Sequence, residues 1–180
     1  SCGASASAAA RDAMAVLAER YPDYRRTVAR HVMLDAAGPF RFAFTLALMR
    51  RSTRPTILML AHDLGGGVRR HVLDLMEQIS DSAHSLMLAS TARGTALSVP
   101  ALPGHPELAL PAERITDLVV LLQSAGVTRA HIHHLMSMDL DVRALLHRLD
   151  VPFDVTVHDY FAICPQVNLL PWLQGAYCGE

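Results

Sequence analysis

The sequence has no lysine, and its 16 basic residues, all arginines, are balanced by 17 acidic residues to a formal net charge of −1. Because there is no excess of positive charge, nucleic acid is not expected as a partner. Three cysteines in 180 residues are too few for a disulfide framework, which favours a reducing, cytoplasmic compartment. The apolar run 42–49 has about half the length of a membrane-spanning helix, and no secretion signal precedes it.

Apolar residues are plentiful enough for a core, since 51% of the chain is hydrophobic and 18% is charged. Residues 1–51 contain no chemical motif and are expected to form a helical amino-terminal extension, with helices at 13–19 and 24–34 and a helix or strand at 40–51. Residues 52–180 are expected to form a separate domain. The chain begins without methionine and ends at Glu180 directly after a loop, so we expect it to be a piece of a longer protein.

From residue 56 onward, short apolar runs alternate with segments of helical periodicity. Strands are expected at 56–61, 85–89, 95–99, 127–133 and 153–157, with a short edge strand at 108–110. Helices are expected at 68–79, 112–124 and 139–149, the last of them capped by Ser137 or Asp139. This alternation predicts an α/β fold, a Rossmann-like parallel sheet with flanking helices, whose later elements are missing.

A glycine-rich turn, within AHDLGGGVRRHV at 61–72, joins the first expected strand to its helix. Gly65, Gly66 and Gly67 let the backbone approach a ligand closely, and the free N–H groups of the helix's first turn favour an anion such as phosphate. The spacing does not fit the dinucleotide fingerprint, and a chain without lysine cannot form the ATP-binding P-loop. NAD and ATP sites are therefore disfavoured, and the alternative to an anion site is a purely structural tight turn.

Histidines follow two later strands. His131 and His133 would face the same side of their strand, but no carboxylate or cysteine follows at a suitable local spacing, so a metal site is disfavoured against a lining or structural role. His158 and Asp159 come at the carboxyl end of the last strand, at the same sheet edge as the glycine turn. Imidazole can donate a hydrogen bond and change charge near neutral pH, which suits a reacting centre.

Two weaker patterns are explained without metal. The pair Asp139 and Asp141 matches the loose D-x-D pattern of some metal-dependent glycosyltransferases, but carboxylates in the first turn of a helix are favoured by the helix dipole alone. Cys164 and Cys178 could close a disulfide or supply half of a zinc site, and reduced thiols are the favoured state.

Taken together, AHDLGGGVRRHV, HIHHL at 131–135 and VTVHDYFAICPQVNLL at 155–170, with YCGE at 177–180, resemble the amino-terminal half of family 4 glycosyltransferases. These are retaining enzymes that use nucleotide-sugar donors and have the GT-B architecture, two Rossmann-like domains that face a cleft. The resemblance covers residues 56–180. The first 50 residues resemble no family that we can name.

The resemblance implies roles for individual residues. His158 corresponds to the family's histidine at the cleft, the expected catalytic residue, and Gly65, Gly66 and Gly67 to the loop that approaches the donor diphosphate and the acceptor. Arg69, ahead of His71, is the candidate in the following helix for an anionic group. The other expected substrate- or diphosphate-binding residues are His133, His134, Asp159 and Tyr160. The resemblance implies no metal and no cofactor besides the nucleotide-sugar co-substrate.

In such enzymes the second domain holds most of the donor, so the chain alone is expected to be inactive although the parent protein is a hexosyltransferase. The expected partners are a sugar or lipid-linked acceptor and, through the missing domain, the nucleotide sugar. A cytoplasmic location is expected, with peripheral contact at the inner face of the cell membrane left open. The alternatives are a non-catalytic GT-B-like binding or scaffolding module, half of a sugar-nucleotide epimerase, and a metal-dependent GT-A transferase.

Overall fold

The computed structural model describes residues 2–62, 65–91, 94–102, 104, 106–110, 114–160 and 163–164. The chain divides into two compact units, Ser1–Ala37 and Gly38–Glu180. The first unit contains helices α1 (Cys2–Arg20) and α2 (Tyr24–Leu34), on either side of a turn that includes Pro22. Proline ends a helix because it has no backbone N–H to donate. No residue of α2 is buried, so this helix contributes nothing to a hydrophobic core.

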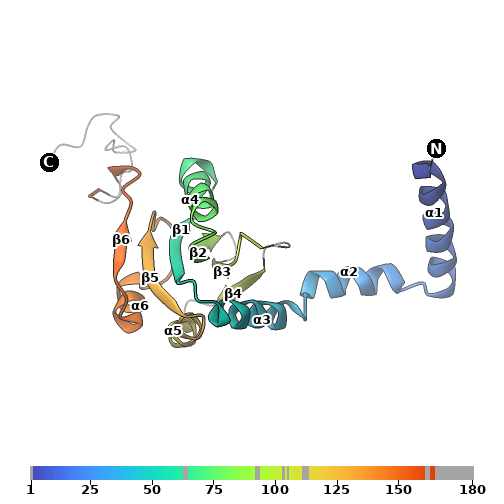
Figure 1. The fold of residues 1–180 in the computed structure, drawn as a ribbon. Coiled ribbons are helices and arrows are strands. Elements are labelled where there is room, and N and C mark those ends of the chain that lie inside the picture. The colour runs from blue at the N-terminus through green and yellow to red at the C-terminus, as the bar shows by residue number, and fades with distance from the viewer. Residues whose placement is uncertain are drawn as a thin grey trace, which may run out of the picture. The chain divides into compact units, whose positions relative to one another are not determined.

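The second unit is built on a six-stranded sheet with strand order β4-β3-β2-β1-β5-β6 (Figure 1). Its strands are β1 (Thr56–His62), β2 (His84–Thr91), β3 (Gly94–Ser98), β4 (Glu107–Leu110), β5 (Val127–Ile132) and β6 (Phe153–Val155). Its helices are α3 (Gly38–Arg51), α4 (Gly66–Gln78), α5 (Ile115–Ser124) and α6 (Val142–Leu149). The predicted α/β class and the predicted order of strands and helices are therefore confirmed.

The sheet is mixed, and the prediction of a parallel sheet was wrong for one half of it. β1 pairs in parallel with β2 and β5, and β5 with β6. β3 runs antiparallel to both β2 and β4. The reason is the short link between β2, which ends at Thr91, and β3, which begins at Gly94. A parallel connection needs a crossover of a dozen or more residues, so two strands joined this closely can only form a hairpin.

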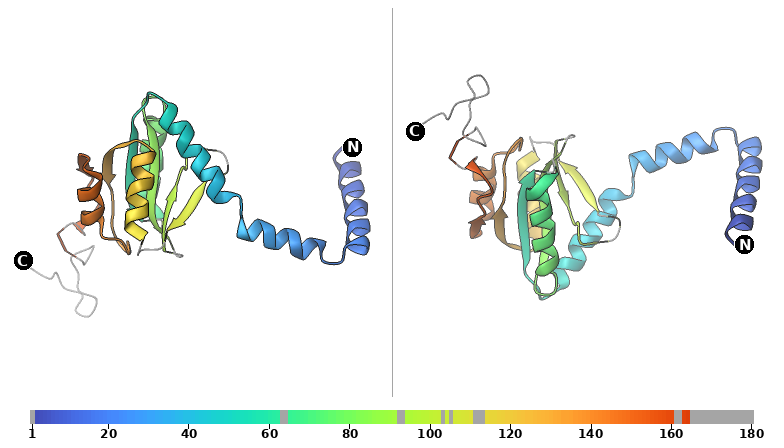
Figure 2. Two further views of the ribbon diagram at one scale, coloured as in Figure 1. Left: turned by 90° about the horizontal axis from the view of Figure 1, so that it is seen from below. Right: turned by 90° about the horizontal axis from the view of Figure 1, so that it is seen from above.

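Helices cover the two faces of the sheet unequally. α4 packs on one face, and α3, α5 and α6 pack on the other (Figure 1, Figure 2). Successive side chains of a strand point to opposite faces, and β1 shows this directly. Leu58 and Leu60 join the core beneath α3, α5 and α6, whereas Met59 and Ala61 join the smaller core beneath α4. Both faces of β1 are thus buried, as its continuous apolar run predicted.

Helix α3 belongs to the second unit. Its buried side chains Phe42, Leu46 and Met49 recur at helical spacing and join the larger core. The predicted boundary between residues 51 and 52 therefore differs from the boundary in the structure, which lies between Ala37 and Gly38. From the sequence, 40–51 could be a helix or a strand. Because side chains that share a face are spaced differently in the two, the residues that point into the core could not be identified.

Helix α6 begins later than predicted and has a different cap. Its N-cap is Asp141, whose carboxylate accepts a hydrogen bond of 2.9 Å from the backbone N–H of Ala144. The prediction of Ser137 or Asp139 as the cap was wrong, and Ser137 instead has a left-handed backbone with φ 58°. The capping explanation of the Asp139 and Asp141 pair is confirmed for Asp141, because a capping carboxylate satisfies a free N–H of the first turn.

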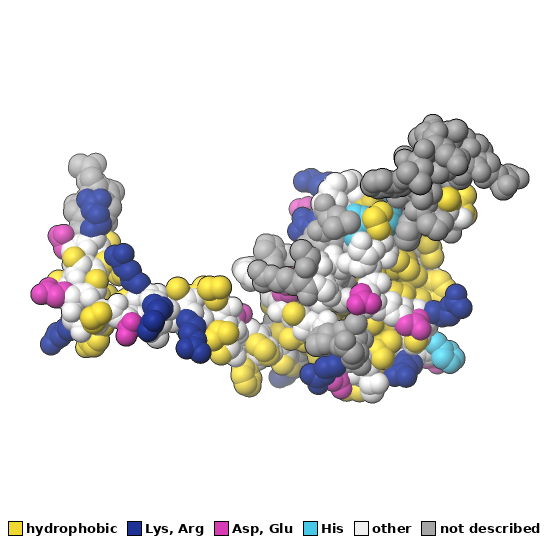
Figure 3. All heavy atoms as spheres, turned by 180° about the vertical axis from the view of Figure 1, so that it is seen from behind, with side chains coloured by type: hydrophobic (Ala, Val, Ile, Leu, Met, Phe, Trp, Pro, Cys, Tyr) yellow, Lys and Arg dark blue, Asp and Glu magenta, His cyan; other side chains and the backbone are white. Residues whose placement is uncertain are grey.

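Among the described residues, one stretch, Tyr24–Arg51, is long and apolar enough to cross a membrane by length and composition. Much of that apolarity belongs to α3, whose inner face packs into the α/β core. A core helix meets the same criterion, so the stretch by itself assigns no location. The outer side of α3 nevertheless exposes Phe40, Phe44 and Leu48, and Figure 3 shows hydrophobic side chains at the surface.

Candidate functional site

The glycine turn leaves the amino-terminal end of α4 open. Gly65 is the N-cap residue with φ 81°, and Gly66, the first residue of the helix, has φ 75°. Both lie in the left-handed region that side chains disfavour, which explains why the chain uses glycine at these two positions. Gly67 has an ordinary backbone in the first turn of α4, and at all three glycines no packing neighbour among the described residues lies within 4 Å of where a β-carbon would stand. The predicted strand–glycine–helix arrangement is therefore confirmed.

Three parallel strands, β1, β5 and β6, carry histidines to one edge of the sheet. His62 is the last residue of β1, His133 and His134 follow β5, and His158 follows β6. The backbone N–H of His133 donates to the carbonyl of Leu60 (2.8 Å), which continues the pairing of β5 with β1 past the end of the strand. Because parallel strands end at the same edge, these residues meet although they are far apart in the sequence.

His71, His133 and His158 form what we call the histidine cluster. The ring of His71, on α4, lies 5.1 Å from that of His158 and 5.5 Å from that of His133 between centroids. Nδ1 of His133 lies 3.3 Å from Nε2 of His158. His71 is exposed, His133 is buried and His158 is half-buried, so the cluster runs from the surface into the protein. Figure 3 shows histidine side chains at the surface of the second unit.

His134 and Asp159 form a second hydrogen-bonded pair, and the contacts of the His134 ring show which of its nitrogens carries the proton. The backbone N–H of Met136 donates to Nδ1 of His134 (3.1 Å), so the proton of the neutral ring is on Nε2. That nitrogen lies 3.1 Å from Oδ2 of Asp159 and donates to it. His134 is buried, and the ring of His62 packs edge-on against it with 4.8 Å between centroids. The carboxylate of Asp159 is thereby held beside His158.

Burial and mutual repulsion keep the cluster's inner rings uncharged. Burial, followed by the neighbouring rings of His131, His158 and His71, lowers the pKa of His133 to about 3. Burial is also the main cause that lowers the pKa of His158, with further contributions from His71 and His134, while Asp159 acts in the opposite direction. His133 and His158 are therefore neutral at pH 7, and each can donate one hydrogen bond and offer one lone pair.

His131 lies beside the cluster with its own partner. Its ring is 4.1 Å from that of His133 between centroids, which agrees with the prediction that the two share a side of the strand. Nε2 of His131 is hydrogen-bonded to Oγ1 of Thr156 (2.8 Å), and burial lowers its pKa. His131 therefore ties β5 to the segment that follows β6.

A cavity of about 250 Å³ opens beside these groups. Its polar lining comes from His133, His134, His158 and Asp159, and its remaining walls from apolar residues after β5 and β6, together with Thr156. Pockets that enclose drug-sized ligands usually have about 300–1,000 Å³. The cavity therefore suits one small polar group better than a whole nucleotide.

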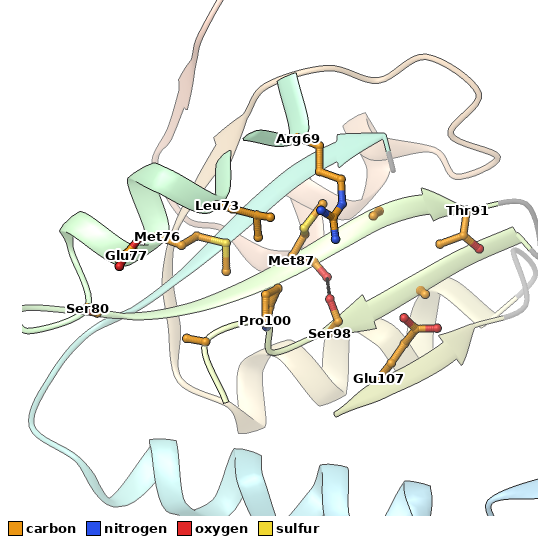
Figure 4. A pocket seen from close by; sticks show the side chains of 13 residues that line it. Arg69, Leu73, Met76, Glu77, Ser80, Met87, Thr91, Ser98, Pro100 and Glu107 are labelled. Carbon is orange, nitrogen blue, oxygen red and sulfur yellow. Dashed lines mark hydrogen bonds between the residues drawn. The ribbon is translucent and has the colours of Figure 1, made fainter. Parts of the chain in front are cut away.

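The predicted residue Arg69 lies at a different place. It lines a cavity of about 640 Å³ between α4 and the strands β2 and β3, which also includes Glu77, Glu107 and Met87. Figure 4 shows the Arg69 side chain reaching from α4 over the sheet into this cavity. Residues two apart on a helix do not face the same way, which explains why Arg69 lines this cavity while His71 contacts the rings of His133 and His158.

Among the described residues, Tyr160 and Cys164 have no contact with the histidine cluster. The side chain of Tyr160 is 53% exposed, and its carbonyl accepts hydrogen bonds from the N–H groups of Ile163 and Cys164. Cys164 is half-buried and forms no disulfide with any described residue, and Cys178 lies outside the described residues. The structure thus brings together His133, His134, His158 and Asp159 among the predicted residues, places the glycine turn at the start of the helix that carries His71, and leaves Arg69 and Tyr160 elsewhere.

Sequence reasoning ranked His71 below Arg69, although His71 contacts both other rings of the cluster. The available signal was its place on the helix that starts at the glycine turn, but nothing in the sequence fixed which side of α4 faces the strands' ends. Comparisons of the chain with protein-family models, with curated proteins and with solved structures gave no match.

Proposed function

We propose that this chain is the acceptor-side domain of a retaining glycosyltransferase that uses a nucleotide-sugar donor and has the GT-B architecture. The observation that carries the proposal is the meeting of the glycine-turn helix with His158. The ring of His71, five residues beyond Gly66 in α4, contacts the ring of His158 after β6. Ligands of open α/β sheets bind at the carboxyl ends of the parallel strands, which is where these groups meet.

In this proposal the open turn at Gly65 and Gly66 receives the donor diphosphate. The first-turn N–H groups of α4 have no partners within the helix, and the helix dipole favours a negative charge there. The absence of side chains at the two glycines lets phosphate oxygens come close. The small cavity beside His158 then has room for the transferred sugar, while the nucleotide is held by the second domain that the proposal requires.

His158 is the proposed catalytic residue. A neutral imidazole can donate its N–H to a hydroxyl of the sugar or to the leaving diphosphate, where negative charge develops in the transition state. Asp159, held by His134, limits how the neighbouring groups can turn. None of these roles needs a metal ion, in keeping with the metal-free chemistry implied by the family resemblance.

The cavity that contains Arg69 is assigned to the acceptor in this proposal. Its arginine and two glutamates offer charged hydrogen-bonding groups, and its apolar floor includes Met87. A sugar presents hydroxyl groups and an apolar ring face, so a mixed lining of this kind suits it. For a lipid-linked acceptor, the exposed Phe40, Phe44 and Leu48 of α3 would provide peripheral contact at the inner face of the cell membrane.

The test is sugar transfer by the protein produced from its natural reading frame, with a panel of nucleotide sugars and His158→Ala as the variant. Loss of one stabilising hydrogen bond in the transition state is expected to lower kcat by about 100- to 1,000-fold. The control is His147→Ala, because His147 is an exposed histidine of α6 outside the site. The 180-residue chain alone is expected to be inactive.

Each other outcome points to a different function. Unchanged transfer by His158→Ala would reject the catalytic assignment, and absence of transfer from every donor would favour a binding or scaffolding module. Conversion of the free sugar nucleotide without an acceptor would identify an epimerase. Transfer by the isolated chain would refute the two-domain requirement.

A further inference from the structure

The histidine cluster has the donor set of a transition-metal site. One ring nitrogen from each of His71, His133 and His158 lies within 4.8 Å of the other two. The three residues come from α4, the end of β5 and the segment after β6, so the convergence is made by the tertiary fold. Three histidine ligands with one open position are typical of catalytic zinc sites.

The distance between the two inner rings fits ligands better than a hydrogen-bonded pair. Nδ1 of His133 and Nε2 of His158 are 3.3 Å apart. Two nitrogens that bind one tetrahedral zinc ion at about 2.0–2.1 Å are separated by about 3.4 Å. A direct N–H hydrogen bond usually has about 2.7–3.2 Å between its heavy atoms. The third ring, that of His71, is on the exposed side of the cluster, where its side chain can turn toward the pair.

Two nitrogens of the inner rings, Nδ1 of His133 and Nε2 of His158, face each other at a point where a cation could bind. Nε2 of His133 is buried without a hydrogen-bond partner among the described residues. An ion bound through Nδ1 of His133, the nitrogen that faces His158, leaves Nε2 to carry the proton of the neutral ring. Nε2 of His158 faces the same point, so an ion placed there would be held by one nitrogen of each inner ring.

Ring nitrogens of the neighbouring His131 and His134 already have hydrogen-bond partners, which favours His71, His133 and His158 as the metal ligands. Nε2 of His131 is bound to Thr156, and both ring nitrogens of His134 have partners in Met136 and Asp159. Nitrogen donors select zinc, cobalt, nickel and copper over magnesium and calcium, which prefer oxygen. The cluster is therefore a site for a borderline transition-metal ion.

We propose that His71, His133 and His158 together bind one zinc ion, with the fourth coordination position left for water or an anionic ligand. This differs from the metal-free site implied by the family resemblance, and it does not depend on sugar transfer. A bound ion would occupy a lone pair of His158, so zinc is expected to inhibit the proposed transferase. The site would thus act as a metal-dependent off state.

The test is titration of the 180-residue chain with zinc chloride against a chromophoric chelator at pH 7. One ion per chain is expected, and His71→Ala is expected to weaken binding by roughly 100-fold or more. His71 is exposed, so its replacement leaves the core intact. The matched control His147→Ala should bind as the wild type does, and excess magnesium should not compete. Equal zinc affinity of His71→Ala and wild type would overturn the proposal.

Cobalt(II) provides a second measurement that identifies the ligands. A tetrahedral site gives intense visible absorption, and cysteine ligands add a strong near-ultraviolet charge-transfer band. We expect the visible bands without the thiolate band, and their loss in His71→Ala. A thiolate band would instead assign the ion to one or more of the cysteines Cys2, Cys164 and Cys178 and reject the histidine site. Because neither titration contains a sugar nucleotide, failure of the zinc site leaves the transferase proposal standing, and the reverse also holds.

Discussion

The two halves of the sheet in the second unit place their polar residues in different ways. Where β1, β5 and β6 run in parallel, the strand ends share one edge and carry His62, His133 and His158 to it. Where β2, β3 and β4 alternate in direction, no common edge exists, and Glu107 of β4 lines a broad cavity together with Arg69 and Glu77 of α4. Strand direction thus decides whether polar groups converge on a point or spread over a face.

This difference also has an electrostatic consequence. At the parallel edge, burial and then the neighbouring imidazoles keep His133 uncharged, whereas the cavity over the antiparallel half is lined by the charged residues Arg69, Glu77 and Glu107. The first arrangement suits direct contact with a reacting group or an ion, and the second suits recognition of a larger polar ligand.

The largest expected effect comes from shortening a buried side chain in the central strand β1. Leu60 of β1 is completely buried, so Leu60→Ala is expected to lower the free energy of unfolding by about 3–5 kcal/mol. Leu108, on the edge strand β4, is only partly buried, and Leu108→Ala is expected to cost about 1 kcal/mol. Urea unfolding followed by circular dichroism measures both. Equal losses would show that the two halves are equally well packed.

The second effect is the acid sensitivity of the metal-free protein, measured with a chelator present. Because the pKa of His133 falls from 6.5 to about 3 on folding, the unfolded chain binds this proton first as the pH is lowered. The stability due to neutral His133 is complete above pH 6.5 and decreases below it, by about 3 kcal/mol at pH 4. Urea unfolding at several pH values should show a shallower acid loss in His133→Gln than in the wild type.

The control for that measurement is His147→Gln on the exposed side of α6. Its pH profile should run parallel to that of the wild type. If the pH profile of His133→Gln also followed that of the wild type, His133 would not have the lowered pKa that distinguishes the edge formed by β1, β5 and β6 from the antiparallel half.

The smallest effect tests the turn that opens α4. Gly66 has φ 75°, so Gly66→Ala places a side chain in the left-handed region and is expected to cost about 1–2 kcal/mol. Gly67 has an ordinary backbone and open space around it, so Gly67→Ala should be neutral or slightly stabilising. Thermal unfolding distinguishes the two variants. Equal melting temperatures would mean that the turn relaxes without strain.

The order of strands and helices was predictable because local periodicity reports it. The continuous apolar run of β1 and the helical stripe of α4 lie within one or two residues of their predicted places. The hairpin β2–β3 was also within reach, since the strands expected at 85–89 and 95–99 are too close for a crossover. The sequence could not show that α3 belongs to the core, because the apolar residues of this helix occur on both its inner and its outer side.

The candidate site likewise has one part that the sequence predicted and another that only the tertiary structure decided. The residue types and their positions after β1, β5 and β6 came from the sequence alone, and with them the hypothesis that a glycine turn and His158 share one edge. Which side of α4 faces that edge depends on how the helix packs on the sheet, and this packing put His71 into the cluster and Arg69 into the other cavity. Periodicity is a local property of the chain, whereas the meeting of three imidazoles from distant segments depends on strand direction and helix rotation, which only long-range packing fixes.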